Sequence, residues 1–73
     1  MKPKYKCAAT MSFAILRLLR RNQSILKSDI EKFIRENSHY KDCSYIIRLV
    51  LNSGFVKQMT FNNEKYFEYT TSN

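Results

Sequence analysis

Residues 43–69, CSYIIRLVLNSGFVKQMTFNNEKYFEY, begin with a stretch whose apolar residues recur at helical spacing. Within residues 43–53, the apolar side chains that fall on one helical face are Ile46, Ile47, Val50 and Leu51. A second face carries a polar set spaced by four residues, together with one tyrosine: Ser44, Arg48, Asn52 and Tyr45. The pattern predicts a helix that buries the first face and exposes the second.

A single glycine separates this helix from two runs rich in β-branched and aromatic residues. Gly54 stands where the end of a helix turns left-handed, and glycine adopts that conformation without steric cost. Residues 55–61 and 65–69 are predicted strands, and residues 62–64 supply two asparagines for the turn between them. The second half of the chain is therefore predicted to be a helix followed by a β-hairpin.

The first predicted helix covers residues 10–21 and is capped by Thr10. Its inward face is made by Met11, Ala14, Ile15, Leu18 and Leu19. Phe13 and Leu16 widen the apolar surface beyond what one small core needs, which favours a homodimer formed through this helix. The alternative is that the C-terminal strands and the N-terminal arm cover these two side chains.

Between the first and third helices the sequence predicts a short strand and a second helix. Residues 24–26, Ser-Ile-Leu, are the candidate strand. Ser28 and Glu31 have the spacing of a capping box, in which each side chain bonds to the backbone amide of the other. The second helix is accordingly expected over residues 29–37, and Asp42 is expected to cap the third.

Length and composition indicate one small folded domain over residues 1–73, with residues 1–9 as a basic arm and residues 70–73 as a frayed tail. The hydrophobic share of 44% excludes disorder. The longest apolar run is far shorter than the roughly 20 residues of a membrane span, so the chain is not expected to be a membrane protein. We expect a cytoplasmic location in a bacterial, archaeal or phage-infected host cell.

The residue types that carry enzyme or metal chemistry are sparse. Cys7 and Cys43 lack metal-ligand spacing and are predicted to be reduced thiols rather than a disulfide. His39 is the single histidine and has no partner at metal or catalytic spacing. The sequence also lacks a Gly-rich phosphate loop, so we expect no enzyme activity, no metal and no cofactor.

The formal charge of +7 is concentrated at the N-terminal end. Residues 1–21 contain six basic residues and no acidic one, whereas residues 55–73 contain equal numbers of both. A small basic domain binds polyanions, of which nucleic acid is the commonest inside a cell. An acidic protein and an anionic lipid surface are the alternatives, and a solubilising tail is the other reading of the basic arm.

With its elements in the order helix, short strand, helix, helix, strand, turn, strand, the chain resembles the winged helix-turn-helix superfamily over residues 10–69. The resemblance is carried by IIRLVLNSGFV, residues 46–56, where an apolar helix runs through a glycine into a strand. Many small bacterial, archaeal and phage regulators have this junction. The resemblance implies an α+β fold with three helices, a C-terminal β-hairpin and a short strand after the first helix.

In that superfamily the third helix enters the major groove of double-stranded DNA, while the second helix and the hairpin wing contact the backbone. By position, the residues that would face base edges are Ser44, Tyr45, Arg48 and Asn52. Arg48 suits a bidentate contact to guanine, and Asn52 suits adenine. The residues expected near phosphates, on the wing or on the basic arm are Lys27, Ser28, Lys41, Lys57, Asn62, Asn63, Lys65, Lys2, Lys4 and Lys6.

The function implied is that of a DNA-binding transcriptional regulator, acting as a dimer. Two features differ from strong DNA binders: the third helix has one arginine and follows Asp42, and the short wing turn contains Glu64. These features favour the alternative, a winged-helix protein-interaction module that serves as an adaptor or inhibitor, binds an acidic partner and does not bind DNA. Tyr45 suits either interface.

Overall fold

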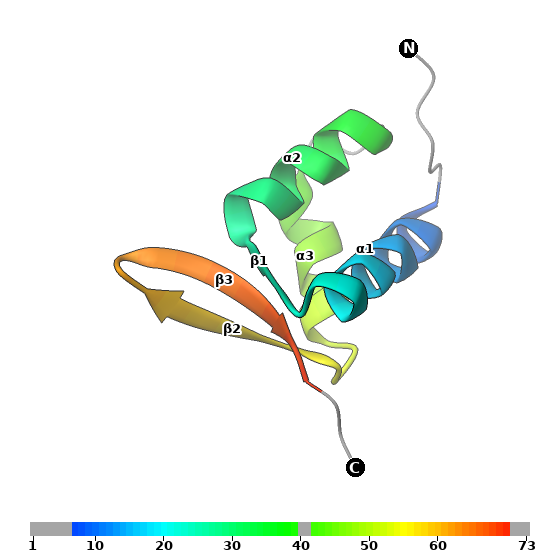
Figure 1. Ribbon diagram of the computed structural model, residues 1–73. Coiled ribbons are helices and arrows are strands. Elements are labelled where there is room, and N and C mark those ends of the chain that lie inside the picture. Colours follow the sequence, from blue (N-terminus) through cyan, green and yellow to red (C-terminus); the bar gives the residue numbers. More distant parts are fainter. Residues whose placement is uncertain (1–6, 40–41, 71–73) are drawn as a thin grey trace.

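The computed structural model describes residues 7–39 and 42–70. Within these residues the chain forms three helices and three strands (Figure 1). In chain order the elements are α1 (Ala8–Asn22), β1 (Ser24–Leu26), α2 (Lys27–Asn37), α3 (Cys43–Leu51), β2 (Val56–Phe61) and β3 (Glu64–Tyr69). The predicted fold class, three helices with a short strand after the first and a C-terminal β-hairpin, is confirmed.

The sheet is antiparallel, and β3 lies between β1 and β2. β2 pairs with β3 along its whole length, from Val56 opposite Tyr69 to Phe61 opposite Glu64. β1 pairs with the other edge of β3. The β2–β3 hairpin projects beyond the helices in Figure 1, and we call it the wing. This arrangement is a winged-helix-like topology.

The wing turn is made by two asparagines. The φ angles of Asn62 and Asn63 are 53° and 65°, in the left-handed region that asparagine tolerates better than most residues. The sequence predicts that Glu64 also belongs to the turn, but Glu64 is the first residue of β3 and pairs with Phe61. Two left-handed residues already reverse the chain, so a third is not needed.

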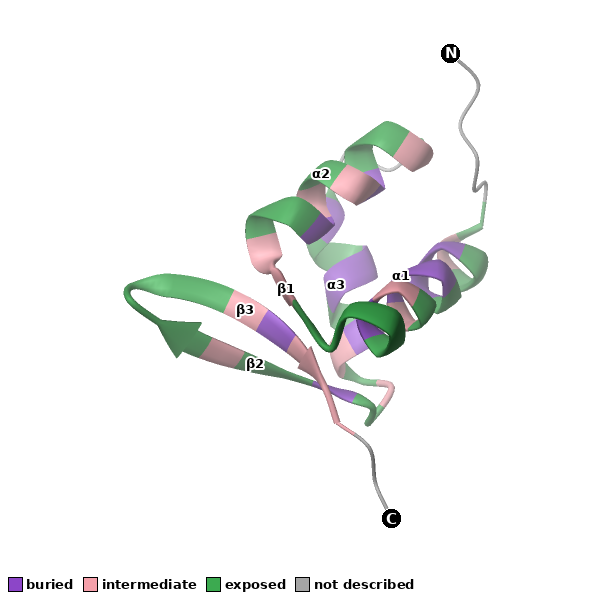
Figure 2. Ribbon diagram, viewed as in Figure 1, coloured by how far each residue is buried: buried purple, intermediate pink, exposed green. Residues whose placement is uncertain are grey.

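The core lies between the helices and the inner face of the sheet, where Figure 2 shows the buried residues. Its largest fully buried side chains are Phe67, Met11, Ile15, Leu19, Ile30, Ile34, Ile46 and Val50. The helical members recur every three or four residues, so each helix buries one stripe. Full burial of such a side chain contributes about 1.5–3 kcal/mol. Because α3 is fixed on this core through Ile46 and Val50, its opposite face is held in place.

The N-terminal ends of α1 and α2 differ from the sequence-based prediction. α1 begins at Ala8, and the hydroxyl of Thr10 donates to the carbonyl of Cys7 at 2.9 Å from within the first turn. α2 begins at Lys27 directly after β1, and no side chain caps it. The predicted caps at Thr10 and Ser28 are therefore wrong. Thr10 lies inside α1 and Ser28 lies inside α2, because both helices begin earlier in the sequence than predicted.

The two ends of α3 follow the prediction more closely. The Asp42 carboxylate accepts from the backbone amide of Ser44 at 3.1 Å and caps the helix as expected. At the other end α3 stops at Leu51: the Asn52 amide makes the last helical bond, to the Arg48 carbonyl at 2.9 Å, and the Ser53 amide then bonds to the Val50 carbonyl at 3.2 Å in a tighter turn. Gly54 has a φ of 85°, so the predicted left-handed glycine is confirmed.

Candidate nucleic-acid interface

The outward face of α3 carries the side chains predicted to read DNA bases. The structure leaves all four exposed, and they are Ser44, Tyr45, Arg48 and Asn52. The exposed fraction of Tyr45 is 49%. Asn52 forms the C-cap of α3, so it lies one full helical turn beyond Arg48. The predicted face therefore exists as a surface, and its role in DNA binding stays a prediction.

Asp42 fixes a negative charge at the first turn of this face. Its Oδ1 atom accepts from both the backbone amide and the hydroxyl of Ser44. The hydrogen bond from the Ser44 hydroxyl lowers the pKa of Asp42 most, and the attraction of Arg48 lowers it further. Ser44 thus uses its hydroxyl proton within the protein. Arg48 is the one basic residue of α3, and it has an anion beside it.

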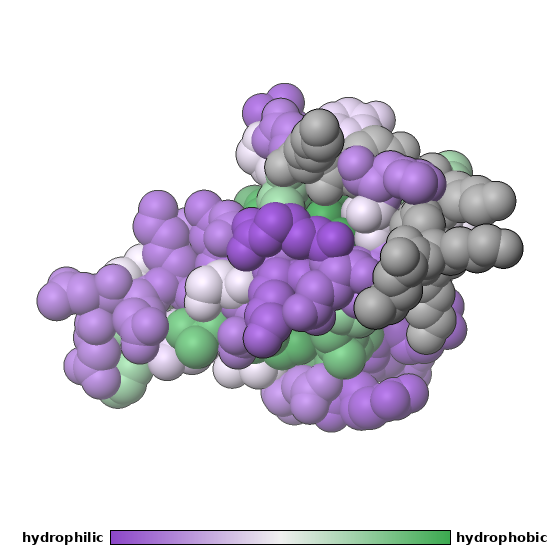
Figure 3. All heavy atoms as spheres, turned by 90° about the horizontal axis from the view of Figure 1, so that it is seen from above, coloured by the Kyte–Doolittle hydropathy of each residue, from purple (hydrophilic) through white to green (hydrophobic). Residues whose placement is uncertain are grey.

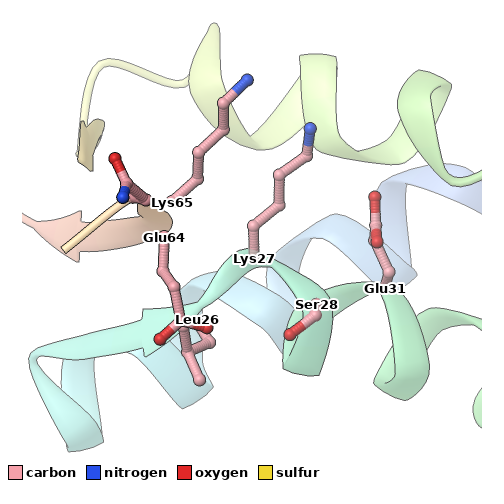
Figure 4. A pocket seen from close by; sticks show the side chains of 7 residues that line it. Leu26, Lys27, Ser28, Glu31, Glu64 and Lys65 are labelled. Carbon is pink, nitrogen blue, oxygen red and sulfur yellow. The ribbon is translucent and has the colours of Figure 1, made fainter. Parts of the chain in front are cut away.

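A second group of predicted residues comes together between the start of α2 and the tip of the wing. A hollow of about 270 Å³ there is lined by Leu26, Lys27, Ser28, Glu31, Asn63, Glu64 and Lys65. In Figure 4 the side chains of Lys27 and Lys65 extend to the same side, toward α3, whereas Glu64 extends the opposite way. Residues that lie far apart in sequence therefore place two ammonium groups on one surface.

Acidic side chains share this hollow, a position that their local sequence pattern does not predict. Glu31 follows Lys27 by one helical turn, and Glu64 precedes Lys65 at the start of β3. Of the two, only Glu31 extends to the same side as the lysines in Figure 4. A phosphate approaching Lys27 and Lys65 would meet one carboxylate rather than two. The wing tip lies near the start of α2 because β3 pairs with β1, which directly precedes α2. A local sequence pattern does not predict this long-range pairing.

Other predicted contacts lie outside this surface. Lys57 forms an ion pair with Glu68 across the strands, with 3.5 Å between its Nζ and Oε1 atoms. Both groups are accessible to solvent, so the pair contributes roughly 0–1 kcal/mol. The candidate contacts that lie outside the described residues are Lys2, Lys4, Lys6 and Lys41.

One exposed aromatic at the wing was missed from the sequence. Phe61, the last residue of β2, is 62% exposed beside the Asn62–Asn63 turn. Its position in an alternating strand is a signal that could have found it, since every second residue of β2 turns away from the core.

On the face seen from above in Figure 3, hydrophilic side chains cover most of the surface, and apolar ones show between them in an interrupted band.

Comparison of the chain with protein-family models, with curated proteins and with solved structures found no significant match. Within residues 7–39 and 42–70, no three His, Cys, Asp or Glu side chains gather as metal ligands. No helix in that same part of the chain has the length and apolar character needed to cross a bilayer.

Proposed function

We propose that this protein is a transcriptional regulator that binds double-stranded DNA, with α3 in the major groove and the wing on the backbone. The observation that carries the proposal is the position of Arg48 on an exposed helix face held rigidly by a packed core. Arginine makes the commonest specific base contact, a bidentate bond to guanine. A rigid helix face suits such readout because little order has to be gained on binding.

Lys27 and Lys65 support the same proposal. Both extend toward the side of α3, at the hollow between α2 and the wing tip. Contacts to phosphate set the register of a protein on the duplex, while side chains on a helix read the bases. Lys27 also stands in the first turn of α2, where unpaired amides and the helix dipole favour an anion. The arrangement would grip one backbone while α3 enters the adjacent groove.

The test is a binding assay in which sites are first selected from random duplex DNA and affinity is then titrated against salt. Arg48→Ala should weaken binding to the selected site by about 1–3 kcal/mol and relax the base preference at one position. Arg21→Ala is the matched control, because Arg21 is an exposed arginine of α1 outside the predicted interface. Equal losses in both variants would mean that only overall charge matters.

The arm lysines predict a different response. Replacing Lys2, Lys4 and Lys6 by alanine should weaken binding to all duplexes alike and reduce the slope of affinity against salt, since phosphate contacts carry no base preference. Sizing of the free protein and of the complex would test the dimer that Phe13 and Leu16 predict. A monomer bound to one half-site would contradict that dimer and leave DNA binding intact.

A protein-interaction module is the second candidate function. It is favoured by the carboxylate of Asp42 on the α3 face and by Phe61 at the wing tip, because a carboxylate repels phosphates and an exposed aromatic suits a protein surface. This reading would replace the first if Arg48→Ala left affinity for DNA and base preference unchanged. It further requires that a pull-down recover one acidic protein whose binding is lost in Tyr45→Ala.

A further inference from the structure

A groove of about 370 Å³ lies between α1 and the residues at the start of β2 and the end of β3. The residues that line it are Phe13, Leu16, Arg17, Arg20, Phe55 and Tyr69, and we call it the α1 groove. None of the side chains predicted to contact DNA lines it. A ligand of this groove would therefore leave the predicted DNA-contacting residues uncovered, but it would compete with the homodimer expected through Phe13 and Leu16.

One wall of the α1 groove is a single stripe of α1. Its four members follow one another at the spacing of a helical face, so apolar side chains stand at one end and guanidinium groups at the other. Phe13 is 61% exposed and Leu16 is half-buried. From residue 13 to residue 20 the helix rises about 10 Å, which is the length of two turns of a docked helix.

The opposite wall is formed by two aromatic rings. Phe55 and Tyr69 stack with their centroids 6.2 Å apart and an interplanar angle of 4°. The backbone behind them is fixed, because the Thr70 amide donates to the Phe55 carbonyl at 2.7 Å and the Tyr69 amide donates to the Gln23 carbonyl at 2.8 Å. Phe55 is 45% exposed. The apolar surface is thus already formed, which lowers the ordering cost of binding.

The charge of the α1 groove is wholly positive. Arg17 and Arg20 line it, and α1 contains no acidic residue from Ala8 to Asn22. The nearest acid in the sheet sequence, Glu68, pairs with Lys57, and the two lie on the face opposite to that of Tyr69, since adjacent residues of a strand alternate. No carboxylate among the lining residues neutralises the two arginines.

These features select among the occupants. A second copy joined through the same face would add two more arginines and no carboxylate, because a two-fold interface is made of the same patch from both copies. An acidic helix supplies the missing carboxylates and pairs them with the guanidinium groups. We infer that the α1 groove docks an amphipathic helical segment of a partner protein, with apolar side chains on Phe13, Leu16 and Phe55 and acidic ones on Arg17 and Arg20.

The segment is described by its spacing. Apolar anchors about one turn apart would contact the Phe13 and Phe55 rings that line the groove, in the manner of helices that lie in hydrophobic grooves. Aspartate or glutamate one turn further along would reach Arg17 and Arg20. The docking would hold whether the α3 face binds DNA or protein, because the two surfaces share no residue.

The test is selection of a displayed library of short helical peptides on the full-length protein. The selected peptides should combine apolar residues at helical spacing with aspartate or glutamate. Their affinity should fall about tenfold or more in Phe13→Ser and in Arg17→Glu, as for central interface residues. Lys32→Glu changes the charge equally on α2, away from the groove, and should change affinity much less.

Charge reversal supplies the check against loss of folding. A selected peptide with its acids replaced by lysine should fail on the wild type and recover binding on Arg17→Glu/Arg20→Glu. Peptides that are basic or neutral, peptides that bind Phe13→Ser equally well, or the absence of any peptide dependent on Phe13 would overturn the inference. So would a dimer in sedimentation that Phe13→Ser dissociates, because the occupant would then be a second copy.

Discussion

One carboxylate oxygen of Asp42 accepts hydrogen bonds from both the backbone amide and the hydroxyl of Ser44. The contact caps α3 and places an anion at the positive end of the helix, where the dipole favours it. The same anion lies beside the face that carries Arg48. Asp42 therefore stabilises α3, and its negative charge would oppose the approach of a phosphate backbone.

Asp42→Asn should separate these two effects. Asparagine caps helices about as well as aspartate, so the melting temperature should change little. Removal of the negative charge should raise affinity for all duplexes and steepen its dependence on salt, because one more protein cation is left free to displace counterions. Titrations at several salt concentrations measure this. Asp42→Ala is the companion variant, in which the cap is lost and the melting temperature should fall. Unchanged DNA affinity in Asp42→Asn would place phosphates away from this end of α3.

Acid should weaken the protein partly through Asp42. The hydrogen bonds from Ser44 hold the pKa of this carboxyl below its ordinary value. A lowered folded-state pKa means that the unfolded chain binds the proton first as the pH falls, so the contribution is present above about pH 4 and lost below it. The free energy of unfolding of wild type and of Asp42→Asn should be measured in urea across pH 2–6, a range that spans the ordinary pKa of a carboxyl. The two curves should coincide near pH 6 and separate at the acid end, where the wild type loses the contribution of ionised Asp42 and the asparagine variant has none to lose. Parallel curves would contradict the assignment.

Gly54→Ala should destabilise the junction between α3 and β2 through the backbone alone. The φ of Gly54 is 85°, and a Cβ built there meets no atom within 4 Å, so the penalty is conformational rather than a clash. A left-handed alanine costs about 1–2 kcal/mol. Gly54→Asn should cost less, because asparagine tolerates positive φ. Chemical denaturation gives both values. Equal stability of all three proteins would mean that the junction relaxes to another backbone conformation.

The two cysteines should react at different rates. Cys7 is exposed at the start of α1, and a hydrogen bond from the Thr10 backbone lowers its thiol pKa, whereas Cys43 is buried. Thiolates are the reactive form, so an alkylating reagent under native conditions should modify Cys7 first. Mass spectrometry over time measures the modification of both cysteines. In the control variant, Cys7→Ser, only Cys43 is left to react. Modification of Cys43 at the same rate would show that α3 opens readily.

The local pattern around Gly54 was sufficient to predict the α3–wing half of the fold. Helical spacing, a left-handed glycine and two alternating runs each depend on neighbours in sequence, and the structure confirms all three. The predicted start of α2, Asp29, was wrong because β1 ends at Leu26 and the helix begins at the next residue, Lys27. Ser28 has capping chemistry, but the strand already determines where the helix begins.

The candidate surfaces were predictable only in part. Exposure of Arg48 follows from helical spacing, and the surplus of Phe13 and Leu16 is visible in the sequence. The second wall of the α1 groove is not visible in the sequence, because strand pairing brings Phe55 and Tyr69 beside α1, from which they are far apart along the chain. The meeting of Lys27 with Lys65 has the same origin. Long-range strand register, rather than local propensity, assembles both surfaces.

β3 follows every other described element along the chain, yet it is the middle strand of the sheet. It also supplies Phe67, the largest of the fully buried side chains. A growing polypeptide that has not yet delivered these residues from the ribosome lacks both the template for its two outer strands and the centre of its core. The three-stranded sheet and the complete core can therefore form only once Glu64–Tyr69 has left the ribosome.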